Sequence, residues 1–390
     1  MSYNSIKSNG AIRVSGLIFL QPDHEGRQSN TTAQQHCICL LKPDNSRPIY
    51  AHAWTLVIMK KYHLYGLGAA LVDTEIQVND QDLVDMKVEK GLMTLVDEER
   101  QQQLTDQLEG HLVHSTRTNG GSACNTVYAA SCFGAKSFYS CKVANDDNGQ
   151  FFLQGLSEAG VDHIEQNHGD EGVTGKCLVL ISPDAERSMN THLGISGSLS
   201  VAQIDETAIA ASEYIYIEGY LVTSDTGRTA AIKAREIAEQ TGVKTALTLS
   251  DPGMVEFFKD GLQQMIGSKV DLLFCNEDEA KQWANTEDLN TAIKTLKQSA
   301  DTFAITQGAN GAVLFDGERL IDIAGTPVRA VDTNGAGDMF AGAFLYAITH
   351  GHDFEAAGKL ASLASATVVS DYGPRLAVEK HQELLSAITV

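Results

Sequence analysis

Residues 214–249 read YIYIEGYLVTSDTGRTAAIKAREIAEQTGVKTALTL, and this stretch decides the fold class. It begins with a short apolar run at 214–217 and continues with an amphipathic segment at 226–241, which Gly242 closes. A second apolar run follows at 244–249. Short apolar runs are typical of buried strands, and apolar residues at helical spacing predict a helix between them. We therefore expect a strand–helix–strand unit whose two strands lie parallel in one sheet.

Strands and helices continue to alternate along the chain from Met59 onward. The other predicted elements are a strand beginning at Tyr62, helices at 147–160 and 277–284, and strands at 270–275, 303–306 and 312–315. Strands that read as short continuous apolar runs are typical of a parallel sheet covered by helices. The fold class is therefore α/β.

Two segments break this rhythm. Residues 73–79 and 174–181 alternate between apolar and polar side chains. Alternation predicts strands with one solvent-exposed face, which do not belong in a sheet covered on both faces. We therefore expect a small β flap beside the main sheet.

Residues 1–58 differ from the rest of the chain. They show neither a strand period nor a helix period, and polar stretches such as 21–35 predominate. The sequence predicts an extension outside the core, poorly ordered or loosely packed, with Met59 as a candidate natural start. A genuine N-terminal subdomain is the alternative.

Composition and charge exclude several classes of protein. The chain has 390 residues, 43% of them hydrophobic and 20% charged, which is typical of globular proteins. Its net charge is −21, so we expect neither nucleic acid nor a membrane surface as a partner, because phosphate groups would repel it. Seven cysteines, an odd number in a long chain, fit reduced thiols in the cytoplasm. No run approaches the ~20 apolar residues of a transmembrane helix.

The strongest chemical signal is the segment VDTNGAGDMFAGAFL at 331–345, in which small residues lead directly into a helix. The backbone amides of Gly335, Ala336 and Gly337 would be unpaired at the helix N-terminus, where the helix dipole favours an anion. Asp338 would face both this cradle and an incoming hydroxyl group. The alternative is structural, with Asp338 as a helix cap and the glycines in a turn. The segment is not a Walker A loop, because the Gly-Lys-Ser/Thr ending is missing.

Two polar turns follow predicted strands elsewhere. Thr306 and Gly308, in TQGANG at 306–311, offer a hydroxyl and a bare amide at the carboxyl end of a strand, where open α/β sheets bind ligands. Asn276 and Glu279 lie three positions apart at a predicted helix start, and an amide with a carboxylate can organise hydrated Mg²⁺. The alternatives are an ordinary turn and a capped helix N-terminus.

A fourth signal is the glycine turn NGGSACN at 119–125. Gly120 and Gly121 would let a polyol ligand approach the backbone, and Asn125 would present an amide that both donates and accepts. Asp73, at the end of the first strand, supplies a carboxylate of the kind that binds paired hydroxyls. The alternatives are an ordinary glycine turn and a solvated aspartate.

Together and in this order, the four signals resemble the ribokinase family, also called the PfkB carbohydrate and nucleoside kinases, over most of residues 59–390. The motif DTNGAGD at 332–338 resembles the family's C-terminal signature, and residues 120–125 resemble its N-terminal one. Residues 276–279 are similar to its Asn-x-x-Glu motif, and residues 306–311 to its nucleotide loop. The resemblance implies a ribokinase-like three-layer α/β/α sandwich with a mostly parallel central sheet and a small β-sheet lid. The lid strands would lie near 73–80, 111–119 and 174–192, within a kinase domain at 59–390.

The resemblance also implies a role for each motif. Asp338 would be the catalytic base, and residues 335–337 the anion hole. The residues that would bind the acceptor are Asp73, Gly120, Gly121, Asn125 and Arg187. Those that would bind ATP are Asn276, Thr306, Gly308 and Gly311, with Glu279 acting on Mg²⁺ through water. A monovalent cation such as K⁺ would bind near Asp332, Asn334 and the loop at 370–373.

The Thr-Asn-Gly form of the signature and the segment 186–193 are most similar to adenosine-kinase-like members. We therefore expect transfer of the ATP γ-phosphate to the 5′-hydroxyl of a ribonucleoside such as adenosine, whose base Leu71, Ile76 and Val78 would cover. A sugar kinase acting on a free or phosphorylated sugar is the alternative. A non-catalytic sugar-sensing protein would lack the base or the anion-hole glycine, and both are present. A homodimer formed through exposed flap edges is compatible with the sequence.

Overall fold

The computed structural model describes residues 11–14, 17–20, 60–111, 113–164 and 171–388. The chain divides into two compact units, 1–57 and 58–390. In the first unit, β1 (Ala11–Val14) pairs antiparallel with β2 (Leu17–Leu20). The second unit contains all the other described elements. The expectation that residues 1–58 lie outside the folding unit stays a prediction.

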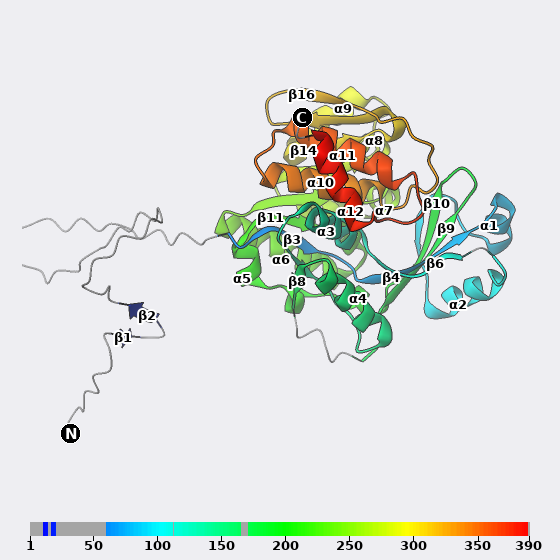
Figure 1. Cartoon of the computed structure of the whole chain (residues 1–390), viewed down its shortest axis with the longest axis horizontal. Helices are drawn as coiled ribbons and strands as arrows, with labels where there is room; N and C mark the ends of the chain where they lie inside the picture. The colour runs from blue at the N-terminus through cyan, green and yellow to red at the C-terminus, as the bar shows by residue number, and fades with distance from the viewer. Residues whose placement is uncertain (1–10, 15–16, 21–59, 112, 165–170, 389–390) are drawn as a thin grey trace, which may run out of the picture. The chain divides into compact units, whose positions relative to one another are not determined.

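A nine-stranded central sheet forms the middle of the second unit (Figure 1). Seven adjacent strands, from β14 to β8 in spatial order, are parallel, and β15 and β16 extend the sheet antiparallel. The strands in spatial order are β16 (Leu320–Ala324), β15 (Gly311–Phe315), β14 (Ala300–Thr306), β13 (Val270–Asn276), β12 (Lys244–Thr248), β11 (Ser212–Ile217), β3 (Tyr62–Leu67), β7 (Ser137–Ser140) and β8 (Val161–His163).

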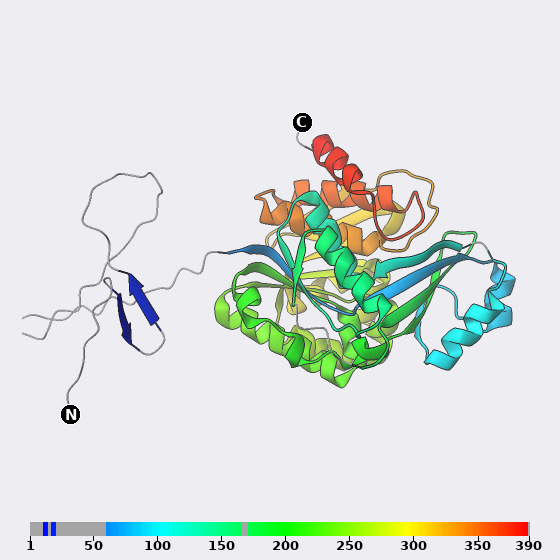
Figure 2. The ribbon, with the colours of Figure 1, turned by 60° about the horizontal axis from the view of Figure 1, so that its bottom comes forward.

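Helices cover both faces of this sheet, because its strands are apolar on both sides. In β11, Tyr214 and Tyr216 belong to one apolar cluster, whereas Ile215 and Ile217 belong to the other. The helices that pack in the first cluster are α3 (Ser122–Phe133), α4 (Asp147–Glu158), α10 (Ala336–Thr349), α11 (Phe354–Val368) and α12 (Val378–Ile388). Those in the second are α5 (Glu206–Ala210), α6 (Asp225–Thr241), α7 (Pro252–Ile266), α8 (Glu277–Trp283) and α9 (Leu289–Ser299). Figure 2 shows α10–α12 and α6 on opposite sides of the strands, so the predicted three-layer α/β fold is confirmed.

A five-stranded small sheet lies beside the central one and contains the predicted flap segments. Its strands in spatial order are β5 (Met93–Leu95), β10 (Arg187–His192), β9 (Gly175–Ile181), β4 (Leu71–Gln77) and β6 (Val113–Gly120). Two helices, α1 (Asp80–Met86) and α2 (Glu98–Gln107), cover the side of this sheet away from the central strands (Figure 1). The apolar cluster beneath them consists of Ile76, Val78, Leu83, Met86, Leu104, Leu108, Leu178 and Leu180.

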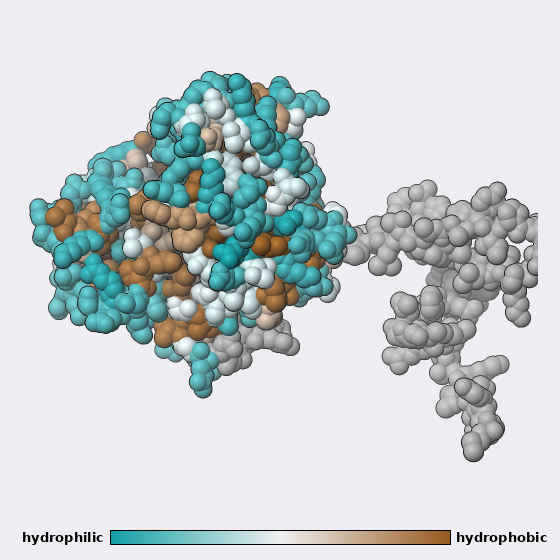
Figure 3. Space-filling model, turned by 180° about the vertical axis from the view of Figure 1, so that it is seen from behind, coloured by the Kyte–Doolittle hydropathy of each residue, from teal (hydrophilic) through white to brown (hydrophobic). Residues whose placement is uncertain are grey.

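The outer surface of the molecule is mixed. Figure 3 shows one face, on which hydrophilic residues surround separate patches of apolar ones. Within the described ranges, none of the helices is both long enough and apolar enough to span a bilayer. The five described cysteines, Cys124, Cys132, Cys141, Cys177 and Cys275, are buried and free.

Candidate active site

A cavity of about 680 Å³ lies where the small sheet, the carboxyl ends of β13 and β14, and the N-terminus of α10 meet. Most of the residues predicted from the sequence line it together, although they come from distant parts of the chain. These lining residues are Asp73, Gly121, Asn125, Arg187, Asn276, Glu279, Thr306, Gly308, Gly311, Asn334, Gly335, Ala336, Gly337 and Asp338. The two others, Gly120 and Asp332, are not among the lining residues.

The predicted anion cradle is the N-terminus of α10. Gly335 precedes the helix with φ 73°, and a Cβ there would come within 2.5 Å of Pro374, so only glycine fits. Gly337 lines the cavity, and a Cβ on it would meet nothing within 4 Å. The amide of Ala336, expected to be unpaired, instead donates to the Thr333 carbonyl across 3.3 Å, because the chain turns tightly before the helix.

Asp338 occupies the first turn of α10 and faces α3. Its Oδ1 accepts a hydrogen bond from Ser122 Oγ at 2.7 Å, and its Oδ2 accepts one from Asn125 Nδ2 at 3.1 Å. Burial raises the pKa of Asp338, whereas these hydrogen bonds and the charges of Arg187 and Arg375 oppose that rise. A carboxylate held in one orientation at the mouth of an anion cradle can accept a proton from a hydroxyl group.

Asp73 lies on β4 with only 5% of its surface exposed. A Cβ on Gly120 would come within 2.1 Å of the Asp73 carboxylate oxygens, so the glycine makes room for this carboxylate, although it does not line the cavity itself. Burial, followed by the charge of Glu75, raises the pKa of Asp73 to about 8. Among the described residues its Oδ1 is a buried oxygen without a hydrogen-bond partner.

Glu218 is a cavity residue that sequence reasoning missed. Its carboxylate accepts hydrogen bonds from the backbone amides of Ala123 at 2.9 Å and Ala69 at 3.4 Å. Burial raises its pKa to about 7. One signal was available, because Glu218 directly follows β11, and the carboxyl ends of parallel strands are where open α/β sheets bind ligands.

The predicted nucleotide residues meet because β13 and β14 pair in parallel register, with Asn276 opposite Thr306. Asn276 and Glu279 form the reciprocal cap of α8: the Asn276 backbone amide donates to Glu279 Oε2 at 3.0 Å, and the Glu279 amide donates to Asn276 Oδ1 at 2.7 Å. Asn276 Nδ2 also donates to Glu279 Oε1 at 2.7 Å. The structural alternative therefore holds for this pair, and both residues also line the cavity. Burial raises the pKa of Glu279 to about 8.

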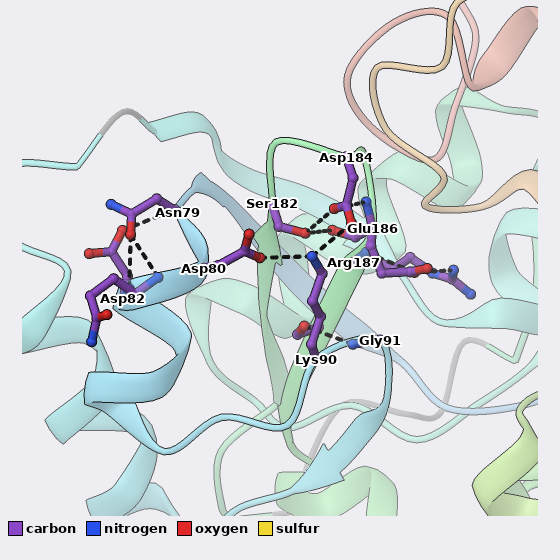
Figure 4. A network of polar contacts seen from close by, with 11 residues as sticks. Asn79, Asp80, Asp82, Lys90, Gly91, Ser182, Asp184, Glu186 and Arg187 are labelled. Atoms are coloured by element: carbon purple, nitrogen blue, oxygen red, sulfur yellow. Dashed lines mark hydrogen bonds and ion pairs between the residues drawn. The ribbon is translucent and has the colours of Figure 1, made fainter.

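Arg187 begins β10 and lines the cavity. Burial raises the pKa values of Asp251, Glu279 and Asp338, and the positive charge of Arg187 opposes that rise in all three. Figure 4 shows how its hairpin is anchored: Lys90 lies 2.7 Å from both Asp80 and Asp184, and the Arg187 side chain points away from Lys90. The ion pair of Arg187 with Glu186, at 3.9 Å, is long, so the guanidinium can also meet an anionic group in the cavity.

Two buried acids meet at the loop where the monovalent cation was expected. Asp332 accepts hydrogen bonds from the amides of Asn334 at 2.8 Å and Gly373 at 2.9 Å. Glu75, a residue sequence reasoning missed, is 2% exposed, and a Cβ on Gly373 would lie 3.4 Å from both of its carboxylate oxygens. Among the described residues Glu75 Oε1 has no hydrogen-bond partner. Carboxylate and carbonyl oxygens suit a hard cation, so these residues fit K⁺.

The apolar cover expected from Leu71, Ile76 and Val78 is only partly present. Leu71 lines the cavity, whereas Ile76 and Val78 pack beneath α1 and α2. The reason is the period of the strand, since side chains at odd and even positions of β4 point to opposite faces. The apolar residues that line the cavity from the small sheet and its flanks are Leu71, Met93, Leu95, Met189 and Leu193.

Comparison with known proteins agrees with this arrangement. Residues 91–381 match the model of the pfkB family carbohydrate kinases. An adenosine kinase of Saccharomyces cerevisiae is 29% identical over 327 residues, which cover 80% of this chain and 92% of that protein. A ribokinase of Haemophilus influenzae is 28% identical over 275 residues, covering 68% of this chain and 86% of that protein. The crystal structure of an adenosine kinase from Sinorhizobium meliloti has a TM-score of 0.79 and 30% identity, covering 84% of this chain and 99% of that one. With most of its folded part inside the matched range and its motifs gathered at one cavity, the chain belongs to the pfkB family of carbohydrate kinases.

Proposed function

We propose that this kinase transfers the γ-phosphate of ATP to the 5′-hydroxyl of a ribonucleoside, with adenosine as the preferred acceptor. The observation that carries the proposal is the apolar wall of Leu71, Met93, Leu95, Met189 and Leu193 in the same cavity as the Asp73 carboxylate. Ribose hydroxyls need polar partners such as Asp73, Asn125 and Glu218, whereas a purine needs an apolar surface. A free sugar would leave that wall uncovered by ligand.

The residues support a simple mechanism. Phosphoryl transfer requires alignment and charge neutralisation rather than covalent chemistry from the protein. Asp338 orients the acceptor hydroxyl and takes its proton, and the amides of Gly335 and Gly337 with Arg187 stabilise the charge on the transferred group. The small sheet over the acceptor excludes water. Bound Mg²⁺ neutralises phosphate charge, and Asn276 and Glu279 would hold it through water.

The test is ADP release with ATP, Mg²⁺ and K⁺ against adenosine, inosine, guanosine, 2′-deoxyadenosine, ribose and fructose. We expect adenosine to have the highest kcat/KM and the deoxy analogue to fall at least about tenfold, since a buried polar group would lose its partner. Asp73→Asn should lower kcat/KM for adenosine and reduce the difference between adenosine and 2′-deoxyadenosine. Asp322→Asn, at an exposed position, should change neither quantity. A sugar with a higher kcat/KM than every nucleoside would establish the sugar kinase alternative. A folded, ATP-binding protein without turnover on any acceptor would favour a sensor.

A further inference from the structure

Arg375 lies in the segment between α11 and α12 and contacts three residues of α3. Its Nε donates to Asn125 Oδ1 at 2.9 Å, and its terminal NH2 group donates to Cys124 Sγ at 3.2 Å. The guanidinium also lies 4.2 Å from the ring centroid of Tyr128. The Tyr128 ring and the two acceptor atoms, all on α3, therefore fix the orientation of this guanidinium.

These contacts determine which way the Asn125 amide faces. An arginine can only donate hydrogen bonds, and an ionised carboxylate can only accept them. Asn125 lies between the two, so its oxygen must face Arg375 and its Nδ2 must face Asp338, as the distances of 2.9 Å and 3.1 Å show. If Arg375 were absent, the amide could turn and present its oxygen to the carboxylate, which would repel it.

We propose that Arg375 is a positioning residue that acts through Asn125 to hold the Asp338 carboxylate in the orientation that accepts the acceptor proton. The inference rests on the proposed role of Asp338 as the base. Ser122 holds Oδ1 and Asn125 holds Oδ2, so both oxygens of Asp338 are restrained from α3. Of these two residues, Arg375 forms a hydrogen bond only with Asn125. A misplaced general base lowers turnover more than it weakens ground-state binding.

The experiment is a double-mutant cycle on kcat at saturating ATP and adenosine, at a fixed pH of about 8. We expect Arg375→Gln to lower kcat about tenfold with the KM for ATP within about twofold of wild type. Asn125→Ala should lower kcat at least as much. The double variant should stay within about twofold of Asn125→Ala, because the hydrogen bonds that link Arg375 to Asp338 run through this amide. Multiplication of the two single losses would overturn the proposal.

Three controls keep the result interpretable. Arg375→Lys retains the charge but not the fork, so we expect it to restore kcat only in part. Arg228→Gln removes an arginine of α6 that pairs with Asp225, outside the cavity lining, and should leave kcat unchanged. If Arg375→Gln fails to fold, Arg375→Lys takes its place in the cycle. Asp338→Asn separates the two proposals. Normal turnover in that variant would show that Asp338 is not the base. Lost turnover in Asp338→Asn, together with an additive cycle, would overturn only the role of Arg375.

Discussion

At the scale of single residues, the Asp338 carboxylate is the group on which turnover depends. Asp338→Asn keeps the shape and both hydrogen-bonding neighbours but loses the proton acceptor. We expect kcat to fall at least ~100-fold, the lower end for loss of a general base, while ATP affinity and the melting temperature stay near those of wild type. Steady-state kinetics with a calorimetric ATP titration measure both. Turnover near that of wild type would show that Asp338 only joins α10 to α3, through Ser122 and Asn125, and is not the base.

The buried carboxylates predict how stability depends on pH. Asp73 and Glu279 have pKa values raised to about 8, and Glu75 and Glu218 to about 7, mainly by burial. In the unfolded chain these groups ionise near about 4, so between these values the folded protein binds more protons than the unfolded one. The contribution of these four groups to the free energy of unfolding therefore falls as pH rises from about 4 to about 8.

Thermal melts of the ligand-free protein in that range test this sign. We expect the melting temperature to fall from about pH 5 to about pH 8.5, and to fall less in Asp73→Asn, which has no charge to bury. The exposed Asp322→Asn should follow wild type. A curve for Asp73→Asn that matches wild type would mean that Asp73 ionises normally in the folded state.

Glu75 predicts a dependence on the monovalent cation. A buried pair of acids around Gly373 is unfavourable unless a cation neutralises it. We expect KCl to raise the melting temperature of wild type above its value in tetramethylammonium chloride of equal ionic strength, and Glu75→Gln to lose most of that increase. The exposed Glu318→Gln should keep it. Equal melting temperatures of wild type in both salts would show that Glu75 is neutralised by a proton instead.

At the scale of elements, the β9–β10 hairpin is held against the loop that precedes the anion cradle. The Ala185 carbonyl at its tip accepts hydrogen bonds from Thr333 Oγ1 at 3.0 Å and from the Thr333 amide at 3.3 Å. Ala185 has φ 65°, a conformation that non-glycine residues seldom adopt, so tertiary contacts hold this turn. The hairpin carries Arg187, and its position therefore affects the acceptor and the phosphate together.

Thr333→Val keeps the shape of the side chain and removes one of these two hydrogen bonds. The net loss is about 0.5–1.5 kcal/mol, so we expect the KM for the acceptor to rise a few-fold while the melting temperature changes little. Thr349→Val removes a comparable hydrogen bond, to Leu345 near the end of α10, and should leave KM unchanged. An unaltered KM in Thr333→Val would mean that the amide alone holds the hairpin.

At the scale of the whole molecule, the unit at 58–390 contains every residue of the candidate site. We expect a chain that begins at Met59 to keep its activity and to melt within a few degrees of the full chain, because polar stretches such as 21–35 predominate in residues 1–58. Circular dichroism melts and the ADP-release assay on both chains provide the measurement. An insoluble or inactive shorter chain would show that the extension stabilises the kinase unit.

Local patterns in the sequence determined the elements and the motifs. The apolar runs at 214–217 and 270–275 predicted β11 and β13, and the segment 226–241 predicted α6 to within one residue at its start. These signals are local, because strand and helix periodicity reflects burial of neighbouring positions in one element. The short strand β5 and the helices α1 and α2 were not predicted, although Asn79 and Asp82 form a capping box that marks the start of α1.

Only the tertiary structure decided which side chains meet. Asn125 and Arg375 are 250 positions apart, and Ser122 and Asp338 are 216 apart, so no spacing in the sequence relates them. The same holds for Glu75 and Gly373, and for the apolar wall, where the alternation of β4 assigns Leu71 to the cavity and Ile76 to the helices. The sequence specifies which residues can donate or accept a hydrogen bond and which are apolar enough to be buried. Strand register, helix packing and loop closure bring distant residues within hydrogen-bonding distance.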